Sequence, residues 1–147
     1  MSARLPTSAI PEPWASQSDS PAMGWLYNTG GIEQALAYSE LFWPEFIEHE
    51  GCILMDRVAD SFRSWSDSLR DPSKVEAMLN HRHICDLFER ETSHDMMIAL
   101  GRVLRDAWTL KLARDFPKRR FAVEFYDAPS QDPTDYQITF YQVPKNI

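Results

Sequence analysis

Histidine and cysteine side chains gather in the segment HRHIC, residues 81–85, with His94 a short way along the chain. Imidazole and thiolate are preferred zinc ligands, and a zinc site needs three or four ligands around one point. On a helix, His81 and His83 would point about 200° apart, whereas His81 and Cys85 would share a face. His81, Cys85 and His94 are therefore the candidate centre of a small metal protein or enzyme. No CxxC, HExxH or HxxxH motif supports them, so we expect surface histidines, a core-facing cysteine, and neither metal nor cofactor.

A second possible chemistry is nucleophilic catalysis by Cys52, which has His49 and Glu50 close by in the sequence. A catalytic cysteine needs a base and an orienting acid within hydrogen-bond reach. Cys52 also opens the short apolar run CILM, residues 52–55, and a cysteine in such a run is more often a packing residue. We therefore expect no catalytic residue here, and we expect both Cys52 and Cys85 to be buried free thiols.

The charged residues are unevenly distributed along the chain, whose net charge is -7. Residues 32–50 hold five acidic residues and no Lys or Arg, namely Glu33, Glu40, Glu45, Glu48 and Glu50. Residues 102–120 hold seven basic residues against Asp106 and Asp115, namely Arg102, Arg105, Lys111, Arg114, Lys118, Arg119 and Arg120. This pattern predicts one acidic region and one basic region.

The acidic region suits recognition of another protein. Glu33 and Glu40 are seven residues apart and share a helix face, and the three later glutamates extend the negative surface. A field of one sign speeds encounter with an oppositely charged partner, and a nearby aromatic side chain such as Tyr38 can act as an anchor. The predicted partner-binding residues are Glu33, Tyr38, Glu40, Glu45, Glu48 and Glu50.

The basic region, residues 102–120, allows a second alternative, the binding of phosphate or RNA. Phe116 and Phe121 could stack on bases there. The overall negative charge opposes a nucleic-acid partner, and the same cations could form a solvated helix face or neutralise the acidic region of their own chain.

Turn-forming residues and the spacing of apolar residues predict the helices and strands that position these side chains. Residues 1–24 contain four prolines among Ser, Ala and Gln, so we expect an extended or mobile arm there and one domain over residues 25–147. A first helix should begin after NTGG, with Asn28 or Thr29 near its cap. Ile32, Leu36, Ser39 and Trp43 should follow one face of this helix, because they recur at helical spacing.

Three further helices are predicted downstream, over residues 57–70, 72–90 and from TSHD, residues 92–95, to Pro117. Asp71 and Pro72 suit a helix start, and Thr92 and Asp95 have capping-box spacing. Near the C-terminus, RFAVEFYD and YQITFYQV alternate apolar and polar residues and flank turn residues, which predicts a β-hairpin. The expected fold is α+β, with about four helices on a small antiparallel sheet, to which CILM could add a third strand.

No apolar run approaches the ~20 residues that cross a bilayer, and the N-terminus lacks the apolar stretch of a signal peptide. We therefore expect a cytoplasmic protein that does not bind a membrane.

In outline, the chain resembles the small bacterial immunity proteins of polymorphic or contact-dependent toxin systems. The similar features are its size, its acidic balance, the segment FWPEFIEHEGCILM after a helix, and the terminal pair RRFAVEFYD and DYQITFYQ. Immunity proteins share no common fold, so no binding residue carries over by position. The resemblance implies a function without catalysis, the inhibition of a cognate, often basic, toxin domain.

Overall fold

The structure is a computed structural model that describes residues 7–12, 14–16, 20–55, 58, 60–88 and 93–144. Within these residues the chain forms five α-helices: α1 (Pro21–Thr29), α2 (Ile32–Phe42), α3 (Phe62–Leu69), α4 (Pro72–Leu79) and α5 (His94–Asp115). It also forms five β-strands: β1 (Phe46–His49), β2 (Cys52–Met55), β3 (Arg82–His83), β4 (Phe121–Phe125) and β5 (Gln137–Gln142). Four short 3-10 helices complete the described structure: η1 (Thr7–Ala9), η2 (Trp14–Ser16), η3 (Ile84–Leu87) and η4 (Pro133–Asp135).

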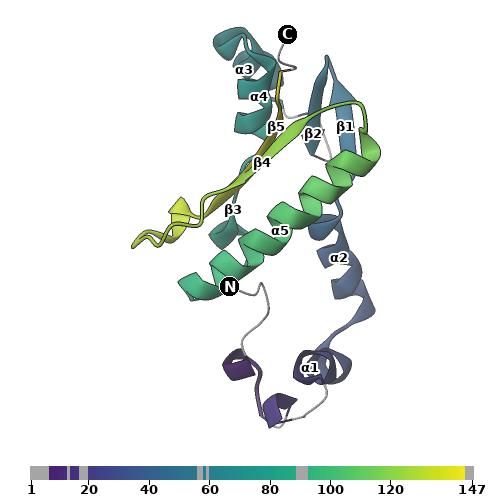
Figure 1. Ribbon diagram of the computed structural model, residues 1–147, viewed down its shortest axis with the longest axis vertical. Coiled ribbons are helices and arrows are strands. Elements are labelled where there is room, and N and C mark those ends of the chain that lie inside the picture. Colours follow the sequence, from purple (N-terminus) through teal and green to yellow (C-terminus); the bar gives the residue numbers. More distant parts are fainter. Residues whose placement is uncertain are drawn as a thin grey trace.

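The strands form two antiparallel sheets (Figure 1). β1 and β2 make a hairpin in which His49 pairs with Cys52, so the turn is the two residues Glu50 and Gly51. Both turn residues have positive φ, 49° and 82°, which is the geometry of a type I′ turn. The second sheet has the order β3-β5-β4, and its β4–β5 pair confirms the predicted C-terminal hairpin. The α+β class is confirmed.

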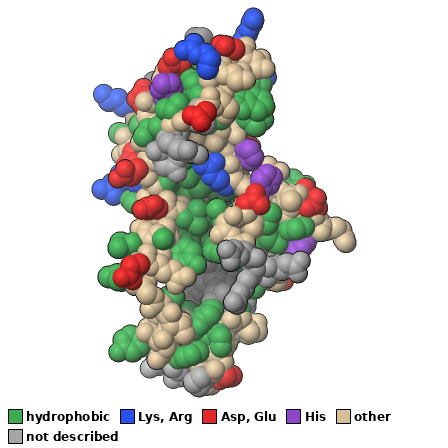
Figure 2. Space-filling view, turned by 180° about the vertical axis from the view of Figure 1, so that it is seen from behind, with side chains coloured by type: hydrophobic (Ala, Val, Ile, Leu, Met, Phe, Trp, Pro, Cys, Tyr) green, Lys and Arg blue, Asp and Glu red, His purple; other side chains and the backbone are tan. Residues whose placement is uncertain are grey.

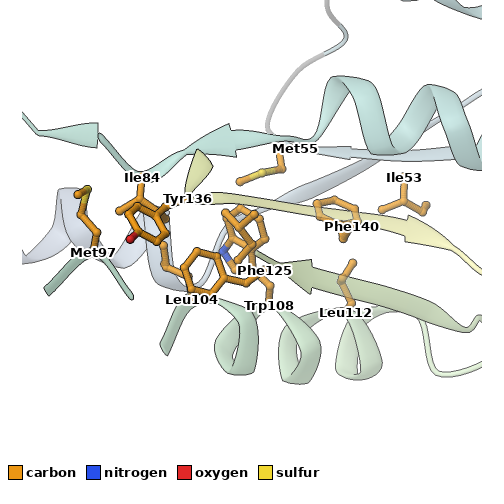
Figure 3. Close-up of a cluster of buried hydrophobic side chains, with 11 residues drawn as sticks. Ile53, Met55, Ile84, Met97, Leu104, Trp108, Leu112, Phe125, Tyr136 and Phe140 are labelled. Atoms are coloured by element: carbon orange, nitrogen blue, oxygen red, sulfur yellow. The ribbon is translucent and has the colours of Figure 1, made fainter. Parts of the chain in front are cut away.

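The main core lies between α5 and the strands, as Figure 3 shows. Trp108 and Leu104 of α5 are fully buried there with Phe140 of β5. Gly101 lets β4 approach α5, because a Cβ at this position would lie 2.1 Å from the Phe125 ring. The Trp108 indole N–H donates to the carbonyl of Leu41 at 2.9 Å, which attaches α2 to α5.

β2 is buried on both faces, which explains its unbroken apolar sequence. Ile53 and Met55 point into the main core, whereas Cys52 and Leu54 point into a second cluster with Phe62 of α3 and Val75 of α4. The prediction of a short buried strand over CILM is confirmed. The suggestion that CILM joins the C-terminal sheet is wrong, because β2 pairs with β1 and the third strand is β3.

A buried carboxylate of α4 connects the two sheets. Glu76 is fully buried, and its Oε1 accepts hydrogen bonds from the N–H of Ile53 at 2.7 Å and from Nε2 of Gln142 at 2.5 Å. Its Oε2 accepts from the N–H of Gln142 at 2.6 Å. The side chain therefore satisfies edge groups of β2 and of β5 that no neighbouring strand reaches.

Asn80, one helical turn after Glu76, makes a second connection. Its Oδ1 accepts from the N–H of Met55 at 3.2 Å, and its Nδ2 donates to the carbonyls of Ile53 and Phe140 at 2.9 and 3.3 Å. Asn80 is also the C-cap of α4, and its backbone N–H bonds the carbonyl of Glu76. The predicted helix over residues 72–90 is therefore wrong beyond Leu79, because the chain turns there into β3 and η3.

Other predicted helix boundaries need smaller corrections. The predicted second helix, residues 57–70, begins only at Phe62 in the structure. Asp71 caps α4 as predicted, by accepting from the N–H of Ser73. Ser93 rather than Thr92 caps α5, and Thr92 lies outside the described residues.

The start of the chain also differs from expectation. Asn28 and Thr29 lie in the last turn of α1, and Gly31 is the N-cap of α2, so the predicted capping role of those two residues is wrong. The expected arm, residues 1–24, contains η1, η2 and the start of α1, so its boundary falls inside a helix. Residues 1–6, 13 and 17–19 of the arm lie outside the described residues, and its mobility stays a prediction.

Candidate functional site

The proposed metal-binding histidines are arranged differently from a helical pair. α4 ends at Leu79, so His81 and His83 lie on an extended segment, and their rings meet edge to face with centroids 5.3 Å apart. The expectation that they point apart is therefore wrong. Nδ1 of His81 lies 2.5 Å from the Met78 carbonyl, and Nδ1 of His83 lies 2.7 Å from the Thr134 carbonyl.

The other two residues of that proposal point to different partners. His94 Nδ1 lies 3.1 Å from the Tyr136 hydroxyl, and the Cys85 thiol donates to the Asp86 carboxylate. Partial burial, followed by the Asp86 carboxylate, raises the pKa of the Cys85 thiol, which disfavours the thiolate that a metal needs. Within the described part of the chain, no three His, Cys, Asp or Glu side chains are grouped closely enough to hold a metal ion.

Cys52 has the environment of a packing residue. It is buried beside α4, and its thiol contacts the Pro72 carbonyl. Burial, together with the carboxylates of Glu76 and Glu50, raises its pKa to about 11, so the thiol is protonated at neutral pH. His49 packs edge to face on Phe62, with ring centroids 4.7 Å apart. Cys52 is therefore buried as predicted, whereas Cys85 is only half-buried.

Much of the basic region is neutralised by carboxylates of the same chain. Four of its cations form ion pairs within the described structure: Arg102 with Asp127, Arg105 with Asp106, Lys111 with Asp115, and Arg119 with Glu48. The rings of Phe116 and Phe121 are half-buried and pack against each other, with centroids 5.9 Å apart. These contacts favour a structural role for the segment over a phosphate or RNA site.

The acidic region divides into two parts with different surroundings. Glu48 and Glu50 lie on the β1–β2 hairpin, where Glu48 meets Arg119 at 2.6 Å and Glu50 lies 4.0 Å from Arg63. Glu33, Glu40 and Glu45 are exposed, and none of them forms an ion pair with another described residue. The free negative charge is therefore on α2 and the linker that follows it.

Tyr38 lies on a different face of α2 from these glutamates. Its ring packs toward Phe88 with centroids 6.3 Å apart, and it is ~160° around the helix from Glu40. The structure brings Glu33 and Glu40 together on one side of α2 and separates Tyr38 from them.

α2 also exposes apolar side chains of the face that the sequence spacing predicted. Ile32 is 73% exposed, Leu36 is 62% exposed and Trp43, just after the helix, is 41% exposed. The core-facing side carries Leu41 and Phe42 instead. Ile32, Leu36, Ser39 and Trp43 share one face of the helix by their spacing, and this face is exposed.

A pocket of about 460 Å³ lies where α2 meets the β1–β2 hairpin. Its apolar lining comes from Trp43, Pro44, Ile47 and Met55, and its polar lining from Ser39, Glu40 and Glu45. We define the outward row of α2 as Ile32, Leu36, Ser39 and Trp43. The row runs along one side of the helix to this pocket, with Glu33 and Glu40 on its flank.

Figure 2 shows hydrophobic and acidic side chains side by side along the left edge of the lower half of the molecule. α2 lies at this height and on this edge after the 180° turn from Figure 1. The surface there combines exposed apolar groups with carboxylates.

The chain matches no family model, no curated protein and no solved structure. Among the helices of the described residues, none has both the length and the apolar character to cross a bilayer.

Proposed function

We propose that this protein is a non-enzymatic, cytoplasmic binding protein that recognises a basic partner protein, and that the partner is a bacterial toxin domain which it inhibits. The observation that carries the proposal is that Glu33, Glu40 and Glu45 are exposed, form no ion pair with another described residue, and belong to a segment, residues 32–50, without Lys or Arg. Such a field accelerates encounter with a basic protein. The resemblance of the chain to immunity proteins names the class of partner.

Glu48 and Glu50 have a smaller part in this function than the sequence suggested. Each already has a cation of its own chain nearby, so a partner would have to compete with Arg119 or Arg63. Exposed carboxylates without a neighbouring cation contribute more to the electrostatic field that steers a basic partner.

The test is binding to the product of the gene next to this one. Association rates are measured at low and high salt for the wild type, for the double variant Glu33→Lys/Glu40→Lys, and for the control Asp60→Lys/Asp67→Lys. Both variants change the net charge equally, and all four positions are exposed. We expect the first variant to slow association at low salt about tenfold, and the control less than about twofold.

Three results would contradict the proposal. Equal rates for the two variants would mean that the α2 carboxylates do not steer the partner. A neighbouring gene for a metabolic enzyme, or one equivalent of bound metal in the purified protein, would favour the alternative centred on His81, Cys85 and His94.

A further inference from the structure

We infer that the outward row of α2 is the docking site of an amphipathic basic segment of the partner, whose apolar residues cover Ile32 and Leu36 and whose Lys or Arg enters the pocket beside Trp43. This inference rests on the proposed function and names the part of the partner that binds.

The apolar row requires an apolar occupant. Ile32 and Leu36 are one turn apart and more than half exposed, while the opposite side of α2 is attached to the core through Leu41 and Phe42. A helix normally buries one apolar stripe and presents polar residues on the other side. In α2 residues 32–40 are all exposed and only Leu41 and Phe42 of the last turn pack against the core, so the apolar side chains of the outward row lie uncovered, and exposed apolar surface marks interaction sites.

The flanking charges select a basic occupant over a second copy of this chain. Glu33 and Glu40 lie on the same flank, seven residues apart, and neither has an ion pair with another described residue. Two copies joined through this face would bring the same carboxylates together, and like charges across an interface oppose association. A segment with Lys or Arg beside its apolar residues fits both features.

The pocket at the end of the row has the lining that a long basic side chain needs. Ile47 and Met55 provide apolar walls, and Glu40 and Glu45 provide carboxylates. Lys and Arg place their methylene stems against apolar surface while the charged end meets a polar group. The pocket offers both environments within the reach of one such side chain.

Trp43 borders this pocket and already attracts cations. Lys111 Nζ and Arg114 Cζ of α5 each lie 5.9 Å from its ring centroid. Lys111 is also paired with Asp115, whereas Arg114 forms no ion pair with another described residue, so the α5 side of Trp43 carries positive charge. The incoming cation is therefore expected at the Glu40 and Glu45 side of the pocket, away from α5.

The probes are three synthetic peptides of about 14 residues, about four helical turns each. One combines Leu with Lys in an amphipathic pattern, one replaces Lys by Glu, and one replaces Leu by Ser. Binding to the full chain is measured by calorimetry, and the contact site by the change in tryptophan fluorescence. We expect only the Leu/Lys peptide to bind, with a Kd of about 10–100 μM.

The matched variants are Leu36→Ser and Leu110→Ser. The two leucines are equally exposed, at 62% and 64%, but Leu110 lies on α5. Leu36→Ser should weaken peptide binding about tenfold and Leu110→Ser less than about twofold. A second matched pair of variants tests the carboxylates. Glu40→Gln/Glu45→Gln should reduce the salt dependence of peptide binding, whereas Asp60→Asn/Asp67→Asn should leave it unchanged.

Three results would overturn the inference. The first is that Leu36→Ser and Leu110→Ser weaken peptide binding equally, and the second is that the Leu/Glu peptide binds as well as the Leu/Lys peptide. The third is wild-type self-association that Leu36→Ser abolishes, which would identify a second copy as the occupant. The proposed function is judged separately. If the neighbouring gene product binds but Leu36→Ser leaves its affinity unchanged, the function stands and the docking site is wrong. If the Leu/Lys peptide binds the α2 row but that product does not bind, the docking site stands and the function is wrong.

Discussion

Helices α2 and α4 carry glutamates to opposite environments. Glu76 of α4 is fully buried and accepts three hydrogen bonds from β2 and β5, whereas Glu40 of α2 is exposed and pairs with no described cation. The same residue type therefore holds two sheets together in one helix and leaves charge available to a partner in the other. Substitutions in α4 should change the stability of the fold, and substitutions in α2 should change binding.

The largest effect is expected for Glu76→Ala. The substitution leaves the buried N–H of Ile53 and the half-buried N–H of Gln142 without their acceptor, and an unsatisfied buried group costs about 1–3 kcal/mol. We expect a loss of about 3 kcal/mol or more in the free energy of unfolding, measured with urea. Glu40→Ala is the control and should change it by less than about 0.5 kcal/mol. Similar losses for both would remove the distinction between the helices.

Asn80→Asp should be the next most severe substitution. It keeps an acceptor for the N–H of Met55 but replaces the donor that reaches the carbonyls of Ile53 and Phe140. A carboxylate facing two carbonyls is unfavourable, so we expect a loss of about 2–3 kcal/mol at neutral pH. The same denaturation experiment measures it, and wild-type stability for Asn80→Asp would show that the Nδ2 contacts contribute little.

The stability of the fold should depend on pH through Cys52, which lies on the face of β2 that packs against the second cluster. Its pKa is about 11 in the folded chain and 9.0 as a free thiol, so the folded state keeps the proton that the unfolded state loses between these values. The contribution to stability is complete below pH 9 and decreases as the pH rises toward 11. We expect the stability advantage of the wild type over Cys52→Ala to fall by about 1–2 kcal/mol between pH 8 and 10.5.

Unfolding curves of the two proteins at both pH values measure this effect. Lys and Tyr also titrate in the window, but they are common to both proteins and cancel in the difference. A constant difference would show that the thiol ionises equally in both states.

The smallest effect on stability is expected for Leu36→Ser. Its side chain is mostly in contact with water, so its removal should change the free energy of unfolding by less than about 0.5 kcal/mol, although it weakens docking. Thermal unfolding measures the change, with Leu104→Ser, at a fully buried position of α5, as the contrast. A large loss for Leu36→Ser would place this side chain in the core and leave the docking surface without support.

Local signals predicted several elements well. CILM is an unbroken apolar run and forms a strand buried on both faces, Asp71 and Pro72 start α4, and the alternation after residue 120 forms β4 and β5. These patterns depend only on residues that are close together in the sequence, because such residues determine the spacing of buried positions and the capping of helices. The helix predicted to continue to residue 90 failed because the contacts that end it, those of Asn80, are made with strands distant along the chain.

The candidate site was only half predictable. The acidic residues were visible in the sequence, but which of them are neutralised was not, because Glu48 meets Arg119 only after the chain has folded. The sequence was equally silent on the packing of α2, in which residues 32–40 are exposed and only Leu41 and Phe42 pack against the core.

The sequence by itself determined the α+β class, the buried β2 strand, the terminal hairpin and the separation of acidic from basic segments, because periodicity, turn residues and charge are local properties. Only the tertiary structure decided that Glu76 and Asn80 are buried and that Ile32 and Leu36 are exposed. The reason is that a polar side chain can be buried wherever unpaired strand edges supply its hydrogen bonds, and an apolar one stays exposed wherever the core is already filled from another side.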